Sequence, residues 1–234
     1  MNAQNPKPII VLENLVKNYR QGKLDVPAVR GVNLEIKSGE FTAISGPSGS
    51  GKTTVLNIIG ALDDPTDGKV FVEGILLSSL SRSVLSKLRR DRIGFVFQAY
   101  NLIPVLTAFE NAEIVLALQG VAVKERRERV MGLLADVGLK GMEHRRPDQL
   151  SGGQQQRVAI ARAIASNPAV VLADEPTANV DSSTAEKLLS IMEKLNREQH
   201  VTFVFSTHDQ KVMDRARRII HLVDGKISND EIRE

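Results

Sequence analysis

The sequence predicts an α/β fold organised around a mostly parallel sheet, and three observations support this prediction. A buried apolar strand at residues 41–45 leads through a glycine-rich turn into a helix at residues 52–61, which is the strand, loop and helix order of a P-loop unit. Residues 81–167 then show mostly helical periodicity. Beyond them, short apolar strands separated by helices return, which is typical of a parallel sheet covered on both faces.

Composition limits the classes of protein that this chain can be. With 234 residues, 42% of them hydrophobic and 25% charged, the chain fits one folded domain, residues 1–234. Zero cysteines exclude disulfides and thiolate metal sites, and a net charge of +3 gives no reason to expect a nucleic-acid partner. Met1 to Pro8 is polar and lacks the apolar core of a signal peptide, and the longest apolar runs are too short to span a bilayer. We therefore expect a soluble or peripheral protein.

The elements follow in order along the chain. Residues 9–40 alternate in the manner of strands, with a loop expected around Gly22 and Pro27, and predict an N-terminal antiparallel β subdomain. Further helices are expected at residues 82–92, 108–119, 124–138, 154–166, 182–198 and 210–217, and strands at 170–173, 201–206 and 219–223. No repeat or linker is visible, so we interpret residues 81–167 as a helical subdomain inserted in one domain.

The turn after the first buried strand has the pattern G-x-x-x-x-G-K-[ST]. Its glycines let successive backbone N–H groups surround phosphate oxygens, and the N-terminus of the next helix directs its dipole at the same anion. Lys52 is expected to reach the β- and γ-phosphates of ATP, and the Thr53 hydroxyl to ligate Mg²⁺. The predicted ATP-binding residues of this segment are Gly46, Pro47, Ser48, Gly49, Ser50, Gly51, Lys52, Thr53 and Thr54.

Two carboxylates, Asp174 and Glu175, follow the apolar strand at residues 170–173. A carboxylate at the end of a buried strand can hold Mg²⁺ through water, and we expect this of Asp174. Glu175 is placed to polarise the attacking water, so we expect it to be the general base. These residues alone could be a polar turn, but the preceding P-loop favours the catalytic interpretation.

The pentapeptide Leu150, Ser151, Gly152, Gly153 and Gln154 decides between classes of P-loop protein. It opens an apolar-periodic helix, whose N-terminus offers a second anion site. With it the chain resembles the ATP-binding-cassette (ABC) ATPases, whose signature it matches, and a nucleotide or metabolite kinase is excluded. The resemblance implies ATP hydrolysis by head-to-tail dimers. In such a dimer each ATP lies between residues 46–54 of one chain and the signature of the other.

Four further positions match this family in their expected order. The resemblance implies that Tyr19 stacks on adenine and that Gln98, after a strand at residues 93–97, senses Mg²⁺ and the attacking water. It also implies that Asp181 lies at the site of the opposite subunit and that His208 contacts the γ-phosphate. Each of these residues alone is more often a packing or hydrogen-bonding residue, but their order behind the two stronger motifs favours function.

The likeness runs nearly the full length and looks closest to the lipoprotein-releasing, macrolide-export and cell-division branch, the LolD/MacB type. Residues 58–66, 94–98 with 101–104, and 158–163 carry it. It implies a transmembrane permease partner of the FtsX, MacB or LolC kind, a homodimer, and a peripheral location on the cytoplasmic face of the inner membrane. Ala178 and Val180 depart from the residues usual beside Asp181.

The apolar residues 99–106 follow Gln98 at the position where this family docks its membrane subunit. We expect them to form the coupling groove, with packing inside the helical subdomain as an equally weighted alternative. A transport ATPase is the primary hypothesis. A mechanical regulator of an extracytoplasmic enzyme or cell-wall machinery, acting through an FtsX-like partner, is the alternative. A soluble cassette ATPase of DNA repair or translation ranks third, because no tandem cassette, coiled-coil insertion or basic arm is visible.

Overall fold

The computed structural model describes residues 8–22 and 24–233, which form two sheets and the helices around them. The strands are β1 (Pro8–Gln21), β2 (Leu24–Lys37), β3 (Phe41–Ser45), β4 (Asp67–Val72), β5 (Ile75–Leu76), β6 (Ile93–Val96), β7 (Val170–Asp174), β8 (Thr202–Thr207), β9 (Arg218–Val223) and β10 (Lys226–Ile232). The α-helices are α1 (Lys52–Ile59), α2 (Arg82–Arg92), α3 (Ala108–Leu118), α4 (Val123–Asp136), α5 (Gly152–Ala165), α6 (Ser182–Gln199) and α7 (Gln210–Arg215). Two short 3-10 helices lie at Leu77–Ser79 and Pro147–Gln149.

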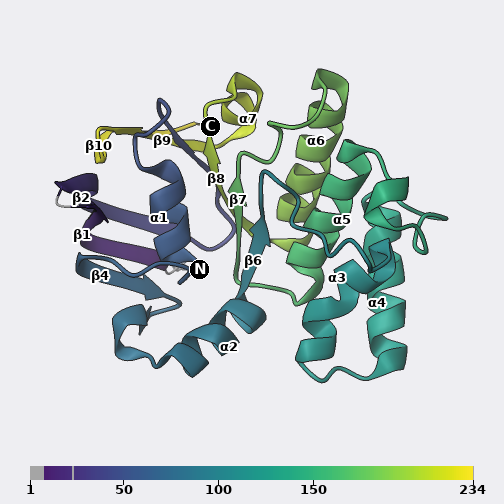
Figure 1. The fold of residues 1–234 in the computed structure, drawn as a ribbon. Helices are drawn as coiled ribbons and strands as arrows, with labels where there is room; N and C mark the ends of the chain where they lie inside the picture. The colour runs from purple at the N-terminus through teal and green to yellow at the C-terminus, as the bar shows by residue number, and fades with distance from the viewer. Residues whose placement is uncertain (1–7, 23, 234) are drawn as a thin grey trace, which may run out of the picture.

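The larger sheet has the strand order β10-β9-β3-β8-β7-β6, and all its pairings are parallel except that of β10 with β9. Every residue of β3 is buried, as expected of a strand covered on both faces. Helix α1 packs between this sheet and the smaller one. On the other side of the molecule, α5 packs against the edge strand β6, and α3 and α4 pack against α5 (Figure 1). The predicted α/β fold and its mostly parallel sheet are confirmed.

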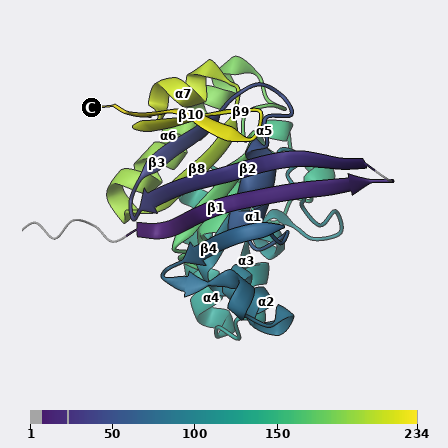
Figure 2. The same ribbon diagram turned by 90° about the vertical axis from the view of Figure 1, so that its left-hand side faces the viewer.

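The smaller sheet is antiparallel, with the order β2-β1-β4-β5. Strands β1 and β2 form a long hairpin that extends beyond the body of the protein (Figure 2). The predicted break at Gly22 is present, but the prediction that Pro27 lies in the loop is wrong, because Pro27 pairs with Asn18 inside β2. The missing N–H of Pro27 is tolerated since β2 is an edge strand and its register shifts between Lys17 and Asn18.

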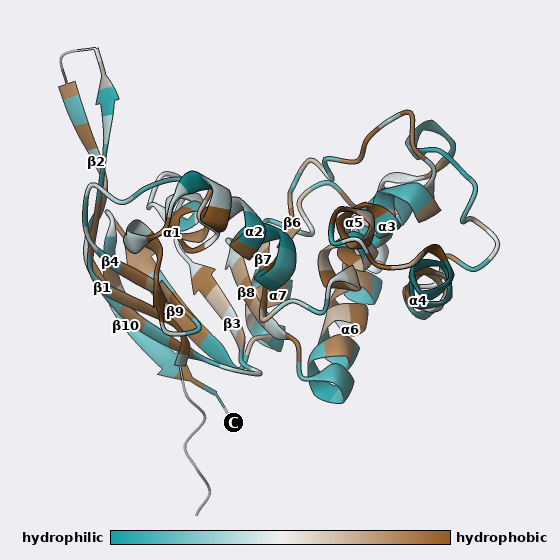
Figure 3. Ribbon diagram, turned by 90° about the horizontal axis from the view of Figure 1, so that it is seen from below, coloured by the Kyte–Doolittle hydropathy of each residue, from teal (hydrophilic) through white to brown (hydrophobic). Residues whose placement is uncertain are grey.

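Two regions differ from the expected plan. Strands β4, β5 and β10 were not predicted, because they are short or carry few apolar residues. Strand β6 pairs with β7 in the larger sheet, and α2 packs against β6. Because β6 belongs to the larger sheet, we propose that the inserted lobe begins after β6 and consists of α3, α4 and α5, which Figure 3 shows on the side of the molecule away from the smaller sheet.

Alternate side chains of the central strands point into two apolar cores. Phe41, Phe203 and Phe205 face the core shared with α3 to α7, and the Phe41 and Phe205 rings lie 4.7 Å apart. Ile44 and Val204 face the core shared with α1 and the smaller sheet. Packing on both faces fixes the carboxyl ends of the parallel strands, which is where ligands bind in open α/β sheets.

Two predictions concern the membrane and the N-terminus. None of the helices within the described residues has the length and the apolar character that a membrane span requires. Residues 1–7 of the polar N-terminal segment, which we predicted not to be a signal peptide, lie outside the residues that the structure describes.

Candidate active site

The loop that joins β3 to α1 is held tightly against β2. Gly51 has a φ of +101°, and a Cβ there would lie 2.4 Å from the carbonyl oxygen of Ala28. Only glycine fits, because both the backbone conformation and the space exclude a side chain. Lys52, which is buried, donates from Nζ to the carbonyl oxygens of Gly46 at 2.8 Å and Pro47 at 2.9 Å. The loop and its lysine therefore form a compact cationic cradle at the N-terminus of α1, where phosphate groups bind.

A hydroxyl and a carboxylate meet beside this cradle. Thr53 is in the first turn of α1 and Asp174 is the last residue of β7. The Thr53 hydroxyl donates to Asp174 Oδ1 at 3.0 Å, although the two residues are 121 positions apart in the sequence. Oxygen ligands of this kind suit Mg²⁺, which also takes phosphate oxygens and water. The residues present therefore fit a magnesium ion that accompanies a bound nucleotide.

Glu175 occupies a constrained position directly after β7. Its φ is +45°, which is unusual for a residue with a side chain, and its N–H donates to the carbonyl oxygen of Ser206 at 2.9 Å. Its Oε1 lies 2.7 Å from His208 Nδ1, and its Oε2 accepts from the Thr207 hydroxyl at 3.4 Å. The Glu175 side chain is 14% exposed and that of His208 is 71% exposed. A carboxylate held on both oxygens at the rim of a site is suited to orient water.

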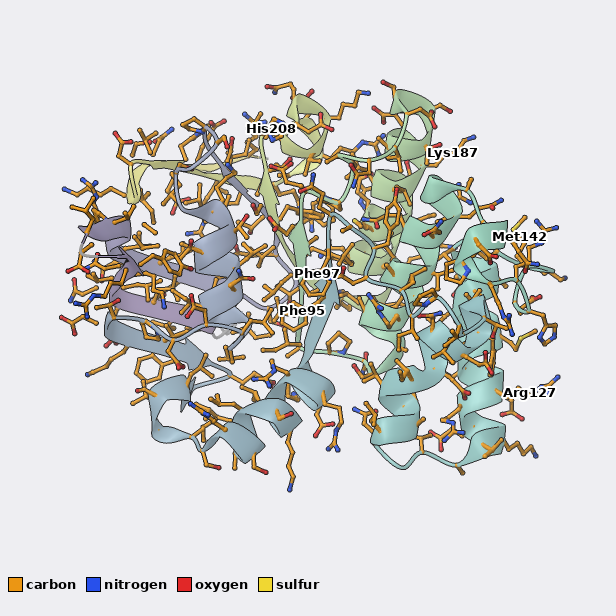
Figure 4. All side chains as sticks on the ribbon, viewed as in Figure 1. Phe95, Phe97, Arg127, Met142, Lys187 and His208 are labelled. Carbon is orange, nitrogen blue, oxygen red and sulfur yellow. The ribbon has the colours of Figure 1, made fainter. Side chains whose placement is uncertain are left out.

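These elements enclose a cleft of about 660 Å³. Figure 4 labels His208, which follows the C-terminal end of β8. The cleft is lined by Tyr19, Ala28, Pro47, Ser48, Gly49, Gly51, Lys52, Thr53, Thr54, Gln98, Glu175 and His208. All of these except Ala28 were named from the sequence, and Ala28 carries no signal that could have identified it, since an alanine in an edge strand has no chemical function. The structure thus brings the predicted phosphate-loop, glutamine, glutamate and histidine positions together.

The signature residues lie elsewhere. Ser151 is the N-cap of α5, and its hydroxyl accepts from the N–H of Gln154 at 3.4 Å while Gln154 Oε1 accepts from the N–H of Ser151 at 2.9 Å. A Cβ on Gly152 would lie 2.7 Å from the Tyr100 hydroxyl, and one on Gly153 would lie 2.3 Å from the Thr184 side chain. A side chain at either position would have to displace one of these neighbours, and the helix N-terminus between them offers free N–H groups to an anion.

Asp181 is the N-cap of α6, as Ser151 is of α5. Its Oδ1 accepts from the N–H groups of Ser183 and Thr184, each at 3.0 Å. Hydrogen bonds from Thr184, through both the side chain and the backbone, lower the pKa of the Asp181 carboxyl. Neither Asp181 nor any of the residues 150–154 lines the cleft. One chain therefore holds two separate halves of the predicted site.

The segment after Gln98 connects these halves. Asn179 Nδ2 donates to the carbonyl oxygen of Gln98 at 2.8 Å, and the Tyr100 hydroxyl donates to the carbonyl oxygen of Asn179 at 3.1 Å. Arg162 of α5 donates to the carbonyl oxygens of Asn101 and Tyr100, at 2.5 and 2.9 Å. Burial lowers the pKa of this guanidinium. Asn179 and Arg162 were not predicted, because their role depends on contacts more than 60 residues away.

The predicted coupling segment, residues 99–106, divides between two environments. Leu102 packs against the core of the helical lobe, whereas Val105 is 71% exposed. A separate apolar groove of about 310 Å³ lies nearby, and its lining includes Phe95, Phe97 and Asn101 but neither Tyr100 nor Leu102. The rings of Phe95 and Phe97 are stacked 5.5 Å apart and are labelled in Figure 4.

Comparison with known proteins assigns the family. A family model described as ABC transporter matches residues 29–178. An ABC transporter ATP-binding protein of Methanocaldococcus jannaschii, MJ0796, is 49% identical over 95% of this chain and 97% of its own length. The lipoprotein-releasing system ATP-binding protein LolD of Anaeromyxobacter dehalogenans is 47% identical over 95% of this chain and 94% of its own.

Two further similarities are to a longer protein that includes a permease and to a solved structure. The macrolide export ATP-binding/permease protein MacB of Hyphomonas neptunium is 48% identical over 95% of this chain, which spans only 34% of that protein. The dimeric structure of MJ0796 in a post-hydrolysis state, bound to ADP and Pi, has a TM-score of 0.90 and 48% identity, and the match covers 96% of this chain and 99% of that one. With the P-loop, the two carboxylates and the signature helix in place, the chain belongs to the ABC transporter family, as an ATP-binding and ATP-hydrolysing subunit.

Proposed function

We propose that the cleft binds Mg·ATP and that Glu175 activates water for hydrolysis. In this proposal the phosphate loop and Lys52 hold the β- and γ-phosphates, and Tyr19 stacks on the base. Thr53 and Asp174 hold Mg²⁺, Gln98 contacts the ion and the water, and His208 contacts the γ-phosphate. The contact that supports this most directly is the 3.0 Å hydrogen bond from Thr53 to Asp174, since it places a hydroxyl and a carboxylate together beside the phosphate cradle.

We further propose that the active unit is a dimer. The signature helix α5 presents a capped N-terminus that the chain's own cleft does not use. A second copy placed head to tail would bring residues 150–154 and Asp181 against the nucleotide, where the N-terminal dipole of α5 stabilises phosphate charge. The solved structures of the relative MJ0796 are dimeric, which supports a dimeric active unit.

The proposed partner is a transmembrane permease of the FtsX, MacB or LolC kind, contacted at the cytoplasmic face of the membrane. Relatives named LolD and MacB support this assignment. The cycle we propose is that two chains close on two Mg·ATP, move the permease, and reset when Glu175 promotes hydrolysis.

The test is the variant Glu175→Gln, which keeps the shape of the side chain and removes its basicity. The rate constant kcat should fall by at least about a hundredfold, and ATP should convert the monomer into a stable dimer, as measured by light scattering during size-exclusion chromatography. A matched control is Glu198→Gln, which removes an exposed carboxylate at the end of α6. A Glu175→Gln variant that stays monomeric at saturating ATP, or that keeps the wild-type kcat, would contradict the proposal.

A further inference from the structure

The aromatic ring at the mouth of the cleft is anchored through its hydroxyl group. Tyr19 is on β1, in the projecting hairpin, and it is 38% exposed. Its hydroxyl donates to Asp63 Oδ2 at 2.8 Å. Partial burial, together with the Asp63 carboxylate, raises the pKa of the Tyr19 phenol, so the hydroxyl keeps its proton. A hydrogen bond at the far end of the ring restricts its orientation.

Asp63 is itself held by a cation. Lys17 Nζ lies 2.6 Å from Asp63 Oδ1 and donates to the carbonyl oxygen of Asp64 at 2.7 Å. The side chain of Lys17 is only 12% exposed. Burial opposes ionisation of Asp63, but hydrogen bonds from Lys17 and Tyr19 hold the pKa of its carboxyl below the usual value. The group that accepts from Tyr19 is therefore a fixed carboxylate.

Lys17 also contacts the ring directly. Its Nζ lies 5.0 Å from the centroid of the Tyr19 ring, within the range of a cation–π interaction. Lys17 and Tyr19 both hydrogen-bond to the Asp63 carboxylate, so their side chains lie on the same side of β1. The ammonium group therefore lies beside the same ring whose hydroxyl is tied to Asp63.

The chain connects this cluster to the phosphate loop through α1, and hydrogen bonds hold the segment after α1 against β1. Asp63 follows the C-terminal end of α1, and the N-terminal end of that helix begins at Lys52 in the cradle. The Thr66 hydroxyl accepts from the N–H of Asn18 at 2.9 Å, and the N–H of Thr66 donates to the carbonyl oxygen of Val16 at 2.8 Å. One short helix thus connects the residues at the phosphate end of the cleft with the residues that hold the ring at the other end.

We propose that Asp63 and Lys17 are positioning residues for the nucleotide base, which they place by fixing the orientation of Tyr19 relative to the phosphate cradle. This inference rests on the proposed binding of ATP in the cleft. Neither side chain lines the cleft, so both act through the ring and not by touching the nucleotide. Their effect should be confined to ligands that carry a base.

The experiment uses two ligands and calorimetric titration of the full chain. ADP carries a base and inorganic triphosphate does not, whereas both fit the phosphate cradle. Asp63→Asn should weaken ADP binding by about three- to tenfold, because a charged acceptor of the hydroxyl is lost and the ring is freed, and should leave triphosphate affinity unchanged. Lys17→Met should act in the same direction. The matched control is Glu13→Gln, which breaks an exposed ion pair from the same strand to Lys69 and should change neither affinity.

The background variant Tyr19→Ala separates the possible outcomes. If the inference is correct, Asp63→Asn has no further effect on ADP binding once the ring is gone. If Tyr19→Ala weakens ADP binding but Asp63→Asn does not, the positioning role is wrong while the ATP site stands. Equal losses for ADP and triphosphate in Asp63→Asn would assign Asp63 to the general stability of the loop, which also overturns the inference. If Tyr19→Ala leaves ADP binding unchanged, the base does not lie at Tyr19, and if the wild-type chain binds neither ligand, the proposed site itself fails.

Discussion

The contact between Gly51 and β2 leads to the sharpest prediction about the phosphate loop. In Gly51→Ala the new methyl group would lie 2.4 Å from the carbonyl oxygen of Ala28, in a backbone conformation with a φ of +101°. A left-handed conformation costs a residue with a Cβ about 1–2 kcal/mol. To restore an ordinary contact the loop and β2 must separate by about 1 Å, and overpacking of this kind costs a further 1–3 kcal/mol or so. The expected loss in the free energy of unfolding is therefore about 2–5 kcal/mol.

A second glycine isolates the effect of the contact. Gly39 has a φ of +79° and open space around the position of a Cβ, so Gly39→Ala pays only the backbone cost of about 1–2 kcal/mol. Urea denaturation measures the stabilities, and steady-state kinetics measure ATP hydrolysis. Gly51→Ala should also lose about a hundredfold in kcat/KM, since a displacement near 1 Å misplaces the phosphate groups, whereas Gly39→Ala should retain wild-type kinetics. If the two variants are equally stable and equally active, the close approach to Ala28 has no energetic consequence and the reasoning is refuted.

Three further predictions concern stability. Asn111 is 1% exposed, and its side chain hydrogen-bonds three carbonyl oxygens and one N–H of the loop before α3. Asn111→Ala should therefore lower the free energy of unfolding by about 2–4 kcal/mol in urea denaturation. A loss under about 1 kcal/mol would show that water replaces the side chain. Ser151→Ala removes the N-cap of α5, so it should lower the free energy of unfolding by about 1 kcal/mol and speed amide hydrogen exchange in the first turn of α5. Ser151→Thr should retain the cap, and equal exchange rates in the two variants would contradict this prediction. Arg218 forms ion pairs with Glu40 and Asp230, at 3.1 and 2.8 Å. Arg218→Met should lower the free energy of unfolding by about 1–3 kcal/mol, and Arg218→Lys should restore only part of that stability, because one ammonium group cannot bind two carboxylates bidentately. Full restoration by lysine would argue against the bridge between the two carboxylates.

Much of the fold follows from periodicity and local motifs. Each predicted helix and strand after residue 40 is present to within two residues at its ends. These elements are long or strongly apolar, and their boundaries are set by groups only a few positions apart, such as the Ser151 cap of α5. The exceptions are instructive. Pro27 reads as a loop residue because a proline disrupts an interior strand, and only the place of β2 at the sheet edge makes it acceptable.

The limits that we propose for the helical lobe could not be predicted from the sequence. A four-residue strand between two helices, β6, cannot be assigned to a sheet from its own residues, since pairing with β7 is a contact across more than 70 positions. Strand β10 carries mostly polar residues and exists because β9 offers it an edge. Tertiary pairing, not local preference, places both strands.

The same division holds for the active site. The sequence alone predicts which residues carry the chemistry, because phosphate loops, a carboxylate after a buried strand and a capped signature helix depend on neighbours within one turn or one strand. Only the tertiary structure decided how they meet. The packing of α1, β1, β7 and α5 decides three features of the site. These are the hydrogen bond from Thr53 to Asp174, the hydrogen bond from Tyr19 to Asp63 and the separation of Ser151 from the cleft. Such contacts are set by the shape of two apolar cores to which most of the helices and strands contribute, and no local pattern of residues encodes that shape.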